Sequence, residues 1–255
     1  MPAIKQAGFY ATVYTEEVTM IGSRVMAVGD VHGQYEKLKK LMRRIKFDPA
    51  QDILVFLGDL IDRGPESLQC FDYAMRLQKQ HPESVIYLMG NHEREMLDYF
   101  DALAKAKDEL DVRLLNRTSQ WLTYGGDKTL PQLQKLGTKA LQNRLDYARN
   151  LPLYYRAGDY YFCHAGVDPD VPLDQQEEKD LIWIREKFYT GYHGKETIVV
   201  GHSPIQNLQY MFKGITWDMY PVIRDNHIIL CDTGSYMEGG RLSCIDVITK
   251  YVWQA

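Results

Sequence analysis

The sequence predicts an α/β fold in which two mixed β-sheets face each other, flanked by helices and extended by a helical cap. Three short apolar runs before residue 90 are separated by segments with helical spacing, and such strand–helix units build parallel sheets. Further apolar runs after residue 150 indicate a second sheet. Polar clusters follow most of these runs, where ligands bind in parallel sheets. The fold class and the place of the site are therefore predicted together.

The first sheet is expected from runs whose length and composition suit buried strands. These runs are residues 24–28, 52–57 and 85–89. Helical spacing of apolar residues predicts helices in the segments 34–51, 65–84 and 92–103. Residues 1–22 show no clear period, and they are either a lead-in arm or an edge strand.

Residues 105–150 differ from the segments around them because they are more charged and contain no strand-like run. Tyr124-Gly125-Gly126-Asp127 interrupts them. We interpret this segment as a mostly helical cap that folds over one edge of the site and sets substrate access. No linker or internal repeat is visible, so we expect a single domain over residues 1–255 with the cap inserted in it.

The second sheet is predicted to begin with a hairpin around Gly158-Asp159, a two-residue turn signal. Its strands are expected at residues 153–157, 160–163, 197–200 and 227–231, with a last strand over 242–252. An acidic loop, residues 174–180, separates the hairpin from the later strands.

Composition excludes several classes of protein. A chain of 255 residues with 45% hydrophobic content can bury one large core. A net charge of −4 is untypical of nucleic-acid binders, which usually carry a basic face. We expect no membrane association, because no run of about 18 apolar residues and no signal pattern occurs. The four cysteines lack disulfide or zinc spacing, which indicates a reduced, cytoplasmic setting. Oligomeric state is left open.

The strand ends carry a candidate metal site made of carboxylates, an amide and imidazoles. These residues are Asp30, His32, Asp59, Asn91, His164 and His202. Such mixed ligands suit Mn²⁺, Fe or Zn²⁺ rather than Ca²⁺. Six ligands exceed what one ion needs, and they suit two ions that share a carboxylate. Two ions can clamp a phosphoryl group and activate a bridging water. The expected reaction is attack of a metal-bridging hydroxide on phosphorus, without a covalent protein intermediate.

The remaining residues of the clusters fit acid–base and phosphate chemistry. His92 is suited to protonate the leaving group, and Asp62 to orient its imidazole. Arg63 offers a planar, bidentate donor for phosphate oxygens. Taken singly, such an Asp or His is more often a cap or a core group, and Arg63 a surface charge. The repetition of glycine-flanked candidate ligands after five apolar runs favours the functional interpretation.

These motifs resemble a known family. Residues 29–33 (GDVHG), 58–64 (GDLIDRG) and 90–93 (GNHE) are similar to the three-part signature of the PPP-type serine/threonine protein phosphatases. His164 and His202 fall where that family has its later ligands. The resemblance implies the calcineurin-like metallophosphoesterase sandwich and two divalent ions, Mn²⁺ first, with Fe or Zn²⁺ as alternatives.

The resemblance also implies how the residues divide between the two ions. One ion would be held by Asp30, His32 and Asp59. The other would be held by Asp59, Asn91, His164 and His202. Trp183-Ile184-Arg185 resembles a segment that supplies a second phosphate clamp, Arg185, in bacterial and phage members. Met89 and Ala165 depart from the eukaryotic pattern and point to the bacterial or phage branch.

Three functions are considered. The first is hydrolysis of phosphate monoesters, with phosphoserine and phosphothreonine in proteins as the expected substrates. The alternative is a symmetrical diadenosine tetraphosphate hydrolase giving two ADP. That family shares the core but typically has Ala at the position of Asp62 and Asp at the position of Glu93, so both residues favour the monoesterase. A non-catalytic phosphate-binding protein is disfavoured because no site residue is missing. The expected partner is a phosphoprotein or small phosphoester.

Overall fold

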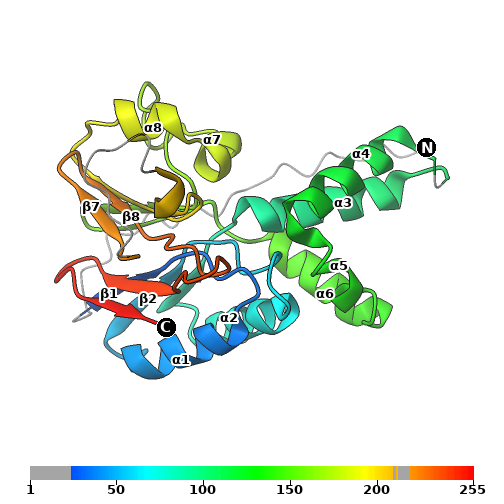
Figure 1. Cartoon of the computed structure of the whole chain (residues 1–255), viewed down its shortest axis with the longest axis horizontal. Helices are drawn as coiled ribbons and strands as arrows, with labels where there is room; N and C mark the ends of the chain where they lie inside the picture. Colours follow the sequence, from blue (N-terminus) through cyan, green and yellow to red (C-terminus); the bar gives the residue numbers. More distant parts are fainter. Residues whose placement is uncertain (1–23, 109, 209–210, 212–218) are drawn as a thin grey trace, which may run out of the picture.

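The computed structural model describes residues 24–108, 110–208, 211 and 219–255. The predicted arm or strand at residues 1–22 lies outside the described residues. Figure 1 shows two β-sheets one above the other, with helices on their outer faces. This arrangement confirms the predicted fold class, two facing mixed sheets flanked by helices.

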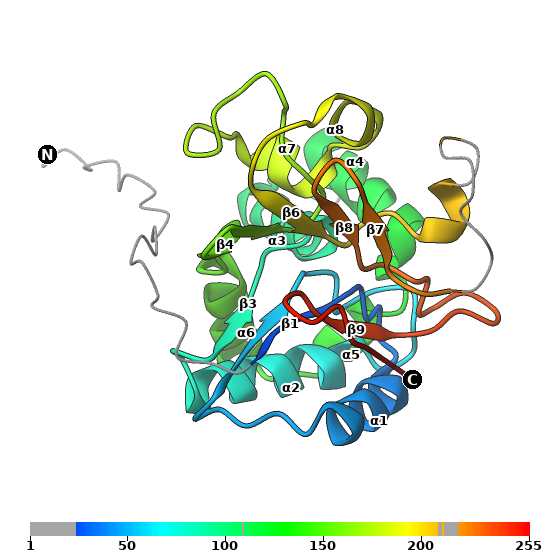
Figure 2. The ribbon, with the colours of Figure 1, turned by 90° about the vertical axis from the view of Figure 1, so that its left-hand side faces the viewer.

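The first sheet has the strand order β10-β9-β1-β2-β3. Its strands are β1 (Arg24–Val28), β2 (Asp52–Phe56), β3 (Val85–Tyr87), β9 (Ser243–Asp246) and β10 (Val252–Gln254). The first three strands run parallel, and they are connected through α1 (Tyr35–Ile45) and α2 (Ser67–Gln80). Both helices lie under the sheet in Figures 1 and 2. The predicted strand–helix–strand–helix–strand order is thus confirmed.

The single last strand predicted over residues 242–252 is wrong, because the structure has two strands there. β9 and β10 pair antiparallel with each other. Asp246 ends β9, and its carboxylate accepts hydrogen bonds from the backbone N–H of Ile248 and the hydroxyl of Thr249. Lys250 has a φ of 63°, in the left-handed region. The side chain of Asp246 thus stabilises a turn that divides the apolar run.

The second sheet has the order β4-β5-β6-β8-β7. Its strands are β4 (Tyr154–Ala157), β5 (Tyr160–Cys163), β6 (Thr197–Val200), β7 (Val222–Arg224) and β8 (Ile228–Leu230). β5, β6 and β8 are parallel, and antiparallel strands flank them. The hairpin predicted around Gly158 is confirmed. α7 (Glu178–Trp183) and α8 (Glu186–Gly191) connect β5 to β6, and a short 3₁₀ helix, Ile205–Leu208, comes after β6. α7 and α8 lie above this sheet in Figure 1.

Alternating side chains of the strands build two apolar layers. Val25 and Ala27 of β1 belong to a buried cluster that also contains Phe162 of the second sheet. Met26 and Val28, the intervening residues, belong to the cluster that includes the helices. Because both faces are covered, the central strands are apolar throughout, as in parallel sheets generally. The packed layers hold the strand ends of both sheets at fixed positions.

The remaining helices project to one side of the sandwich (Figures 1 and 2). They are α3 (Asn91–Lys105), α4 (Val112–Trp121), a π-helical turn (Leu122–Gly126), α5 (Leu130–Leu133) and α6 (Thr138–Arg149). α4 to α6 occupy the segment interpreted from sequence as a cap, and its role in substrate access stays a prediction. No helix within the described ranges is long and apolar enough to span a bilayer.

Candidate metal and catalytic site

The predicted site residues gather where strands of the two sheets end. Asp30 and His32 follow β1, and Asp59 follows β2. The others come from the start of α3 and from the ends of β5 and β6, and they are Asn91, His92, His164 and His202. These seven side chains are buried. Two groups of candidate ligand atoms share Asp59: one contains His32 and His92, and the other His164 and His202.

Unusual backbone conformations mark the same residues. Nine described non-glycine residues have positive φ, and five of them belong to the predicted site: His32, Asp59, Asp62, Arg63 and His202. Such conformations are costly for non-glycine residues and persist only where surrounding contacts impose them. Their concentration here is independent support for a functional site, since it does not depend on which side chains bind metals.

The second ligand group brings side-chain nitrogen and oxygen atoms close to one another. The Nδ1–H of His164 donates to the carbonyl oxygen of Leu57 at 2.8 Å, so Nε2 of the neutral ring carries a lone pair. That nitrogen lies 2.9 Å from Oδ1 of Asn91 and 3.2 Å from Oδ2 of Asp59. His202 Nδ1 is 3.1 Å away from it. These ligand atoms converge as they would around a cation.

His32 of the first ligand group is oriented in the same way as His164. The Nδ1–H of His32 donates to the carbonyl of Ile61 at 2.9 Å, which turns the lone pair of Nε2 toward the carboxylates. Nε2 lies 3.8 Å from Oδ2 of Asp59 and 3.9 Å from Oδ2 of Asp30. Burial, together with the negative charges of Asp232 and Asp59, raises the pKa of Asp30 well above its ordinary value. A divalent cation would offset this accumulation of buried charge.

The donor set therefore fits two divalent metal ions around a shared carboxylate. Among the described residues, two further buried atoms at this place have no hydrogen-bond partner, Nε2 of His202 and Oδ2 of Asp232. Burial raises the pKa of Asp232 to about 6. Asp232 follows β8, so it is another strand-end carboxylate, to which the sequence interpretation assigned no role.

His92 is paired with Asp62 as predicted. Its Nδ1 lies 2.8 Å from Oδ2 of Asp62, and both side chains are buried. Nε2 lies 3.8 Å from Oδ2 of Asp59. Burial lowers the pKa of His92, but the charge of Asp59 and the hydrogen bond and charge of Asp62 outweigh it, so the pKa is raised overall. The geometry permits two roles for this imidazole, proton donor or metal ligand.

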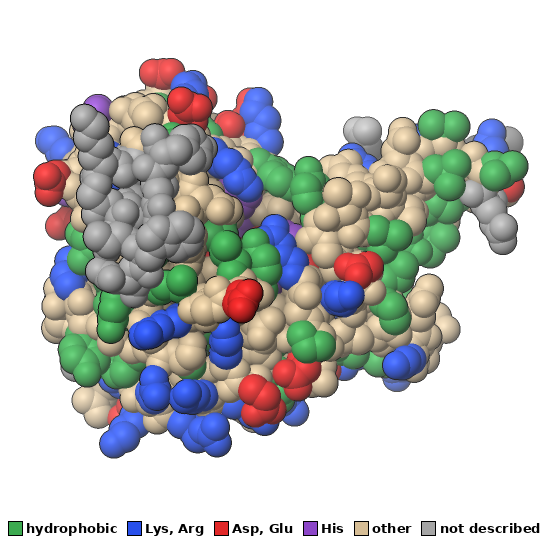
Figure 3. Space-filling model, in the orientation of Figure 1, with side chains coloured by type: hydrophobic (Ala, Val, Ile, Leu, Met, Phe, Trp, Pro, Cys, Tyr) green, Lys and Arg blue, Asp and Glu red, His purple; other side chains and the backbone are tan. Residues whose placement is uncertain are grey.

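The two predicted phosphate clamps are placed differently. Nη2 of Arg63 lies 3.1 Å from Nε2 of His92, and its guanidinium lies over the ring of Tyr236 at 4.4 Å. Arg185 is exposed at the start of α8. The pKa of His202 is lowered well below its ordinary value by burial, by His164 and by the charge of Arg185. Arg63 is thus beside the buried cluster, whereas Arg185 acts on it from the surface. Figure 3 shows histidine side chains in the hollow between the sandwich and the projecting helices.

Glu93 holds two of the predicted motifs together. Its carboxylate accepts hydrogen bonds from the backbone N–H groups of Asp59 and Leu60, both at 2.9 Å, and from the hydroxyl of Tyr87 at 2.8 Å. Gly90 packs directly on Asp59, where a Cβ atom would collide with the carboxylate. The third motif therefore fixes the position of the shared carboxylate as well as providing Asn91.

Sequence interpretation missed three further residues that contact this site. Trp121 and Thr129 hydrogen-bond to Asp62, and the ring of Tyr236 lies 5.0 Å from that of His32. Trp121 and Thr129 lie on either side of the glycine pair at 125–126, which interrupts the cap sequence. That interruption was the signal available to find them.

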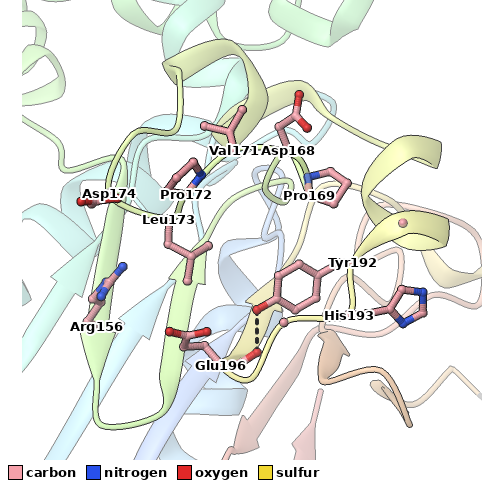
Figure 4. Close-up of a pocket in the computed structure, with 12 residues that line it drawn as sticks. Arg156, Asp168, Pro169, Val171, Pro172, Leu173, Asp174, Tyr192, His193 and Glu196 are labelled. Carbon is pink, nitrogen blue, oxygen red and sulfur yellow. Dashed lines mark hydrogen bonds between the residues drawn. The ribbon is translucent and has the colours of Figure 1, made fainter.

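A second hollow lies on the second sheet, between β4, the loop of residues 168–174 and the chain after α8 (Figure 4). Arg156, Asp168 and Glu196 are among its lining residues, and the hydroxyl of Tyr192 donates to the carbonyl of Glu196 across it at 2.8 Å. None of the predicted site residues lines it. The chemistry of this protein is therefore assigned to the strand ends.

Fold and site together define a metallophosphoesterase. The family model for the calcineurin-like phosphoesterases matches residues 23–233, and the chain belongs to this family. It is a metal-dependent phosphoesterase, as the sequence predicted. The resemblance to bacterial phosphatases and to symmetrical tetraphosphatases is also confirmed by the relatives described next.

Two curated relatives have different activities in their names. A serine/threonine-protein phosphatase 1 of Salmonella typhimurium is 30% identical over 71% of this chain and 79% of its own length. A symmetrical bis(5'-nucleosyl)-tetraphosphatase of Dechloromonas aromatica is 32% identical over 60% of this chain. The chain spans 47% of that relative's length, and the tetraphosphatase name is the more frequent among the similar proteins.

Solved structures share the fold. One assigned provisionally as a diadenosine tetraphosphatase has a TM-score of 0.65 at 23% identity and covers 93% of this chain and 94% of its own. A serine/threonine phosphatase from Saccharomyces cerevisiae has a TM-score of 0.59 at 16% identity, over 90% of this chain and 74% of its own. At such identities the likeness concerns the fold alone.

Proposed function

We propose that this chain hydrolyses phosphate monoesters, and that phosphoserine and phosphothreonine in proteins are its substrates. The observation that carries the proposal is the buried His92–Asp62 pair, joined at 2.8 Å beside the candidate metal ligands. An alkoxide such as that of serine is a poor leaving group, so it requires a proton as the bond to phosphorus breaks. A buried, oriented imidazole is suited to provide that proton.

The proposed metal ligands are Asp30, His32, Asp59, Asn91, His164 and His202, with Asp59 shared between two ions. Bound divalent ions would lower the pKa of a water molecule and neutralise phosphoryl oxygens. The residues orient these groups: backbone carbonyls of Ile61 and Leu57 fix the tautomers of His32 and His164. We propose Mn²⁺ as the native metal, with Fe or Zn²⁺ as alternatives, because the ligand types suit all three.

The remaining roles fall to residues at the edge of the cluster. His92 protonates the leaving oxygen from Nε2, and Asp62 holds its Nδ1–H. Arg63 binds non-bridging phosphate oxygens with a guanidinium placed by Tyr236 and by the carbonyl of Tyr124. Arg185, exposed at the start of α8, is proposed as a second phosphate clamp. We also propose that the cap selects substrates. The sequence further predicts that the protein is a single domain and that it is cytoplasmic.

The second candidate function is symmetrical hydrolysis of diadenosine tetraphosphate. It is favoured by the more frequent name among similar curated proteins. A nucleoside diphosphate is a better leaving group than an alkoxide, so its departure depends less on an acid. The buried His92–Asp62 pair, which is suited to supply a proton to the leaving group, therefore supports the monoesterase.

A side-by-side product assay on chelated, Mn²⁺-reloaded protein tests the proposal. One sample contains a phosphothreonine peptide, and the other contains diadenosine tetraphosphate. We expect phosphate from the peptide and little ADP from the dinucleotide. Rapid release of ADP with little phosphate from the peptide would contradict the proposed substrate class and support the second candidate.

A further inference from the structure

We infer that Trp121 and Thr129 of the cap are positioning residues for the acid pair, so that the cap holds Asp62 and thereby His92 in place. The inference rests on the role proposed above for Asp62 and His92. It extends that role because the cap was interpreted from sequence as a cover over substrate access, not as a support for the reacting groups.

The carboxylate of Asp62 is held by three side chains from three parts of the chain. Oδ2 accepts a hydrogen bond from the indole N–H of Trp121 at 2.9 Å, in addition to that from His92 at 2.8 Å. Oδ1 accepts from the hydroxyl of Thr129 at 2.5 Å. Asp62 and Trp121 are fully buried, so water does not replace these donors. With both oxygens held, the carboxylate plane and the imidazole bound to it have a single orientation.

The cap also holds the backbone of this site. Asp62 and Arg63 are consecutive residues with φ values of 70° and 64°, a costly conformation for side chains with a Cβ. The N–H of Asp62 is shared between Ser67 Oγ at 2.9 Å and Thr129 Oγ1 at 3.0 Å. The N–H of Arg63 donates to the carbonyl of Gly125 at 3.0 Å. Contacts from the cap thus compensate the two strained residues that carry the orienting carboxylate and the phosphate clamp.

Trp121 is itself held by contacts with α3 and with the cap. Its ring lies 5.1 Å from that of Tyr99 and 6.3 Å from that of Phe100, both on α3. On another side the backbone of Gly126 packs so closely that a Cβ would lie 2.6 Å from the indole. A buried Trp needs a partner for its N–H in any protein. Trp121 is distinguished by its partner, the carboxylate of Asp62, which is also hydrogen-bonded to His92.

The test uses the dependence of rate on the leaving group, which a general loss of structure would not change. Trp121→Phe removes the N–H donor and keeps an aromatic ring. Thr129→Val removes the hydroxyl at nearly constant shape, and Thr129→Ser restores it. Each variant, loaded with Mn²⁺, is assayed on phenyl phosphate and on p-nitrophenyl phosphate, which are similar in size but differ in how much the leaving oxygen needs a proton.

We expect kcat on phenyl phosphate to fall about 10- to 100-fold in Trp121→Phe and Thr129→Val, the range typical when a residue that orients a functional side chain is lost. On p-nitrophenyl phosphate the loss should be several-fold smaller. Thr129→Ser should retain the wild-type ratio of the two rates, and metal content should be unchanged in every variant. Thr129→Val is the safer variant for folding, because it replaces one side-chain oxygen with a methyl group.

An equal loss on both substrates, or no loss on either, would overturn the inference. So would a loss of bound metal in the Thr129→Val protein. Failure of the proposed function looks different: wild-type protein that cleaves neither phosphate ester would refute that function. If Asp62→Asn showed no dependence on the leaving group, the acid pair itself would be wrongly assigned, whatever the cap variants do.

Discussion

The strand-end cluster and the surroundings of Asp62 are both buried and polar, but they are satisfied in opposite ways. Around Asp59, lone pairs face other acceptors, as Nε2 of His164 faces Oδ1 of Asn91 at 2.9 Å. Around Asp62, both carboxylate oxygens accept hydrogen bonds from protein side chains, among them Trp121 and Thr129. A cation would stabilise the first arrangement, whereas hydrogen bonds from protein side chains alone hold the second in one geometry. The comparison separates groups that bind metal from groups that orient an acid.

The largest effect is expected from Asp59→Asn, because both ligand groups contain this carboxylate. Removing its charge should abolish binding at one or both positions and cost several kcal/mol of charge stabilisation, on the order of 10⁴-fold in kcat. Metal analysis by plasma mass spectrometry together with steady-state kinetics measures both. An Asp59→Asn protein that keeps two ions would contradict the shared-ligand arrangement.

His92→Asn sharpens the comparison, since the imidazole of His92 faces both regions: Nε2 lies 3.8 Å from Oδ2 of Asp59, and Nδ1 lies 2.8 Å from Oδ2 of Asp62. As the acid, this residue should contribute about 10²–10⁴-fold to turnover of a phosphothreonine peptide, in the range of general acids. Metal content should stay nearly unchanged, as measured on the same preparation by plasma mass spectrometry. Loss of an ion in this variant would assign His92 to the metal ligands instead.

Gly126→Ala tests whether close packing holds the indole of Trp121 in the cap. The new methyl group would meet the ring of Trp121, and overpacking of this kind costs about 1–3 kcal/mol of unfolding free energy. Gly137→Ala is the matched control, because nothing lies within 4 Å of its Cβ position and φ is −67°. Its unfolding free energy in urea should change by no more than about 0.5 kcal/mol. Equal effects of the two substitutions would show that Trp121 is not tightly seated.

The smallest effect is expected from thiol reagents. All four cysteines are free and buried. Cys163 and Cys231 directly precede His164 and Asp232, and burial raises the pKa of both thiols. Because the thiolate is the reactive form, Ellman's reagent should titrate none of the cysteines in native protein and all four after denaturation. The activity of the native protein should be the same with and without the reagent. Rapid reaction of native protein, accompanied by inactivation, would show that the strand ends open to solvent.

Local sequence patterns predicted the metal side of the site because each ligand directly follows an apolar strand. β1, β2 and β3 and the helices between them were found within a few residues for the same reason. Register and packing then bring together residues as distant as Asp30 and His202, whose N–H donates to that carboxylate at 3.0 Å. Parallel strand ends made this convergence predictable.

The contacts that hold Asp62 could not be predicted in this way. Trp121 and Thr129 lie 59 and 67 residues from Asp62. Their contacts follow from how α4 and the π-helical turn pack, and no short spacing encodes that. The division of residues 242–252 into β9 and β10 was missed because one aspartate side chain makes the turn. Supporting contacts thus depend on tertiary packing, whereas the ligand positions follow from secondary structure.

The most direct test of the account is an anomalous diffraction experiment on crystals of the protein loaded with Mn²⁺. The account predicts two anomalous peaks, both coordinated by Asp59, one beside His32 and one beside His164 and His202. Asp62 should remain bonded to Trp121 and Thr129, without contact to either ion. A single peak, peaks away from Asp59, or an ion bound by Asp62 would contradict it.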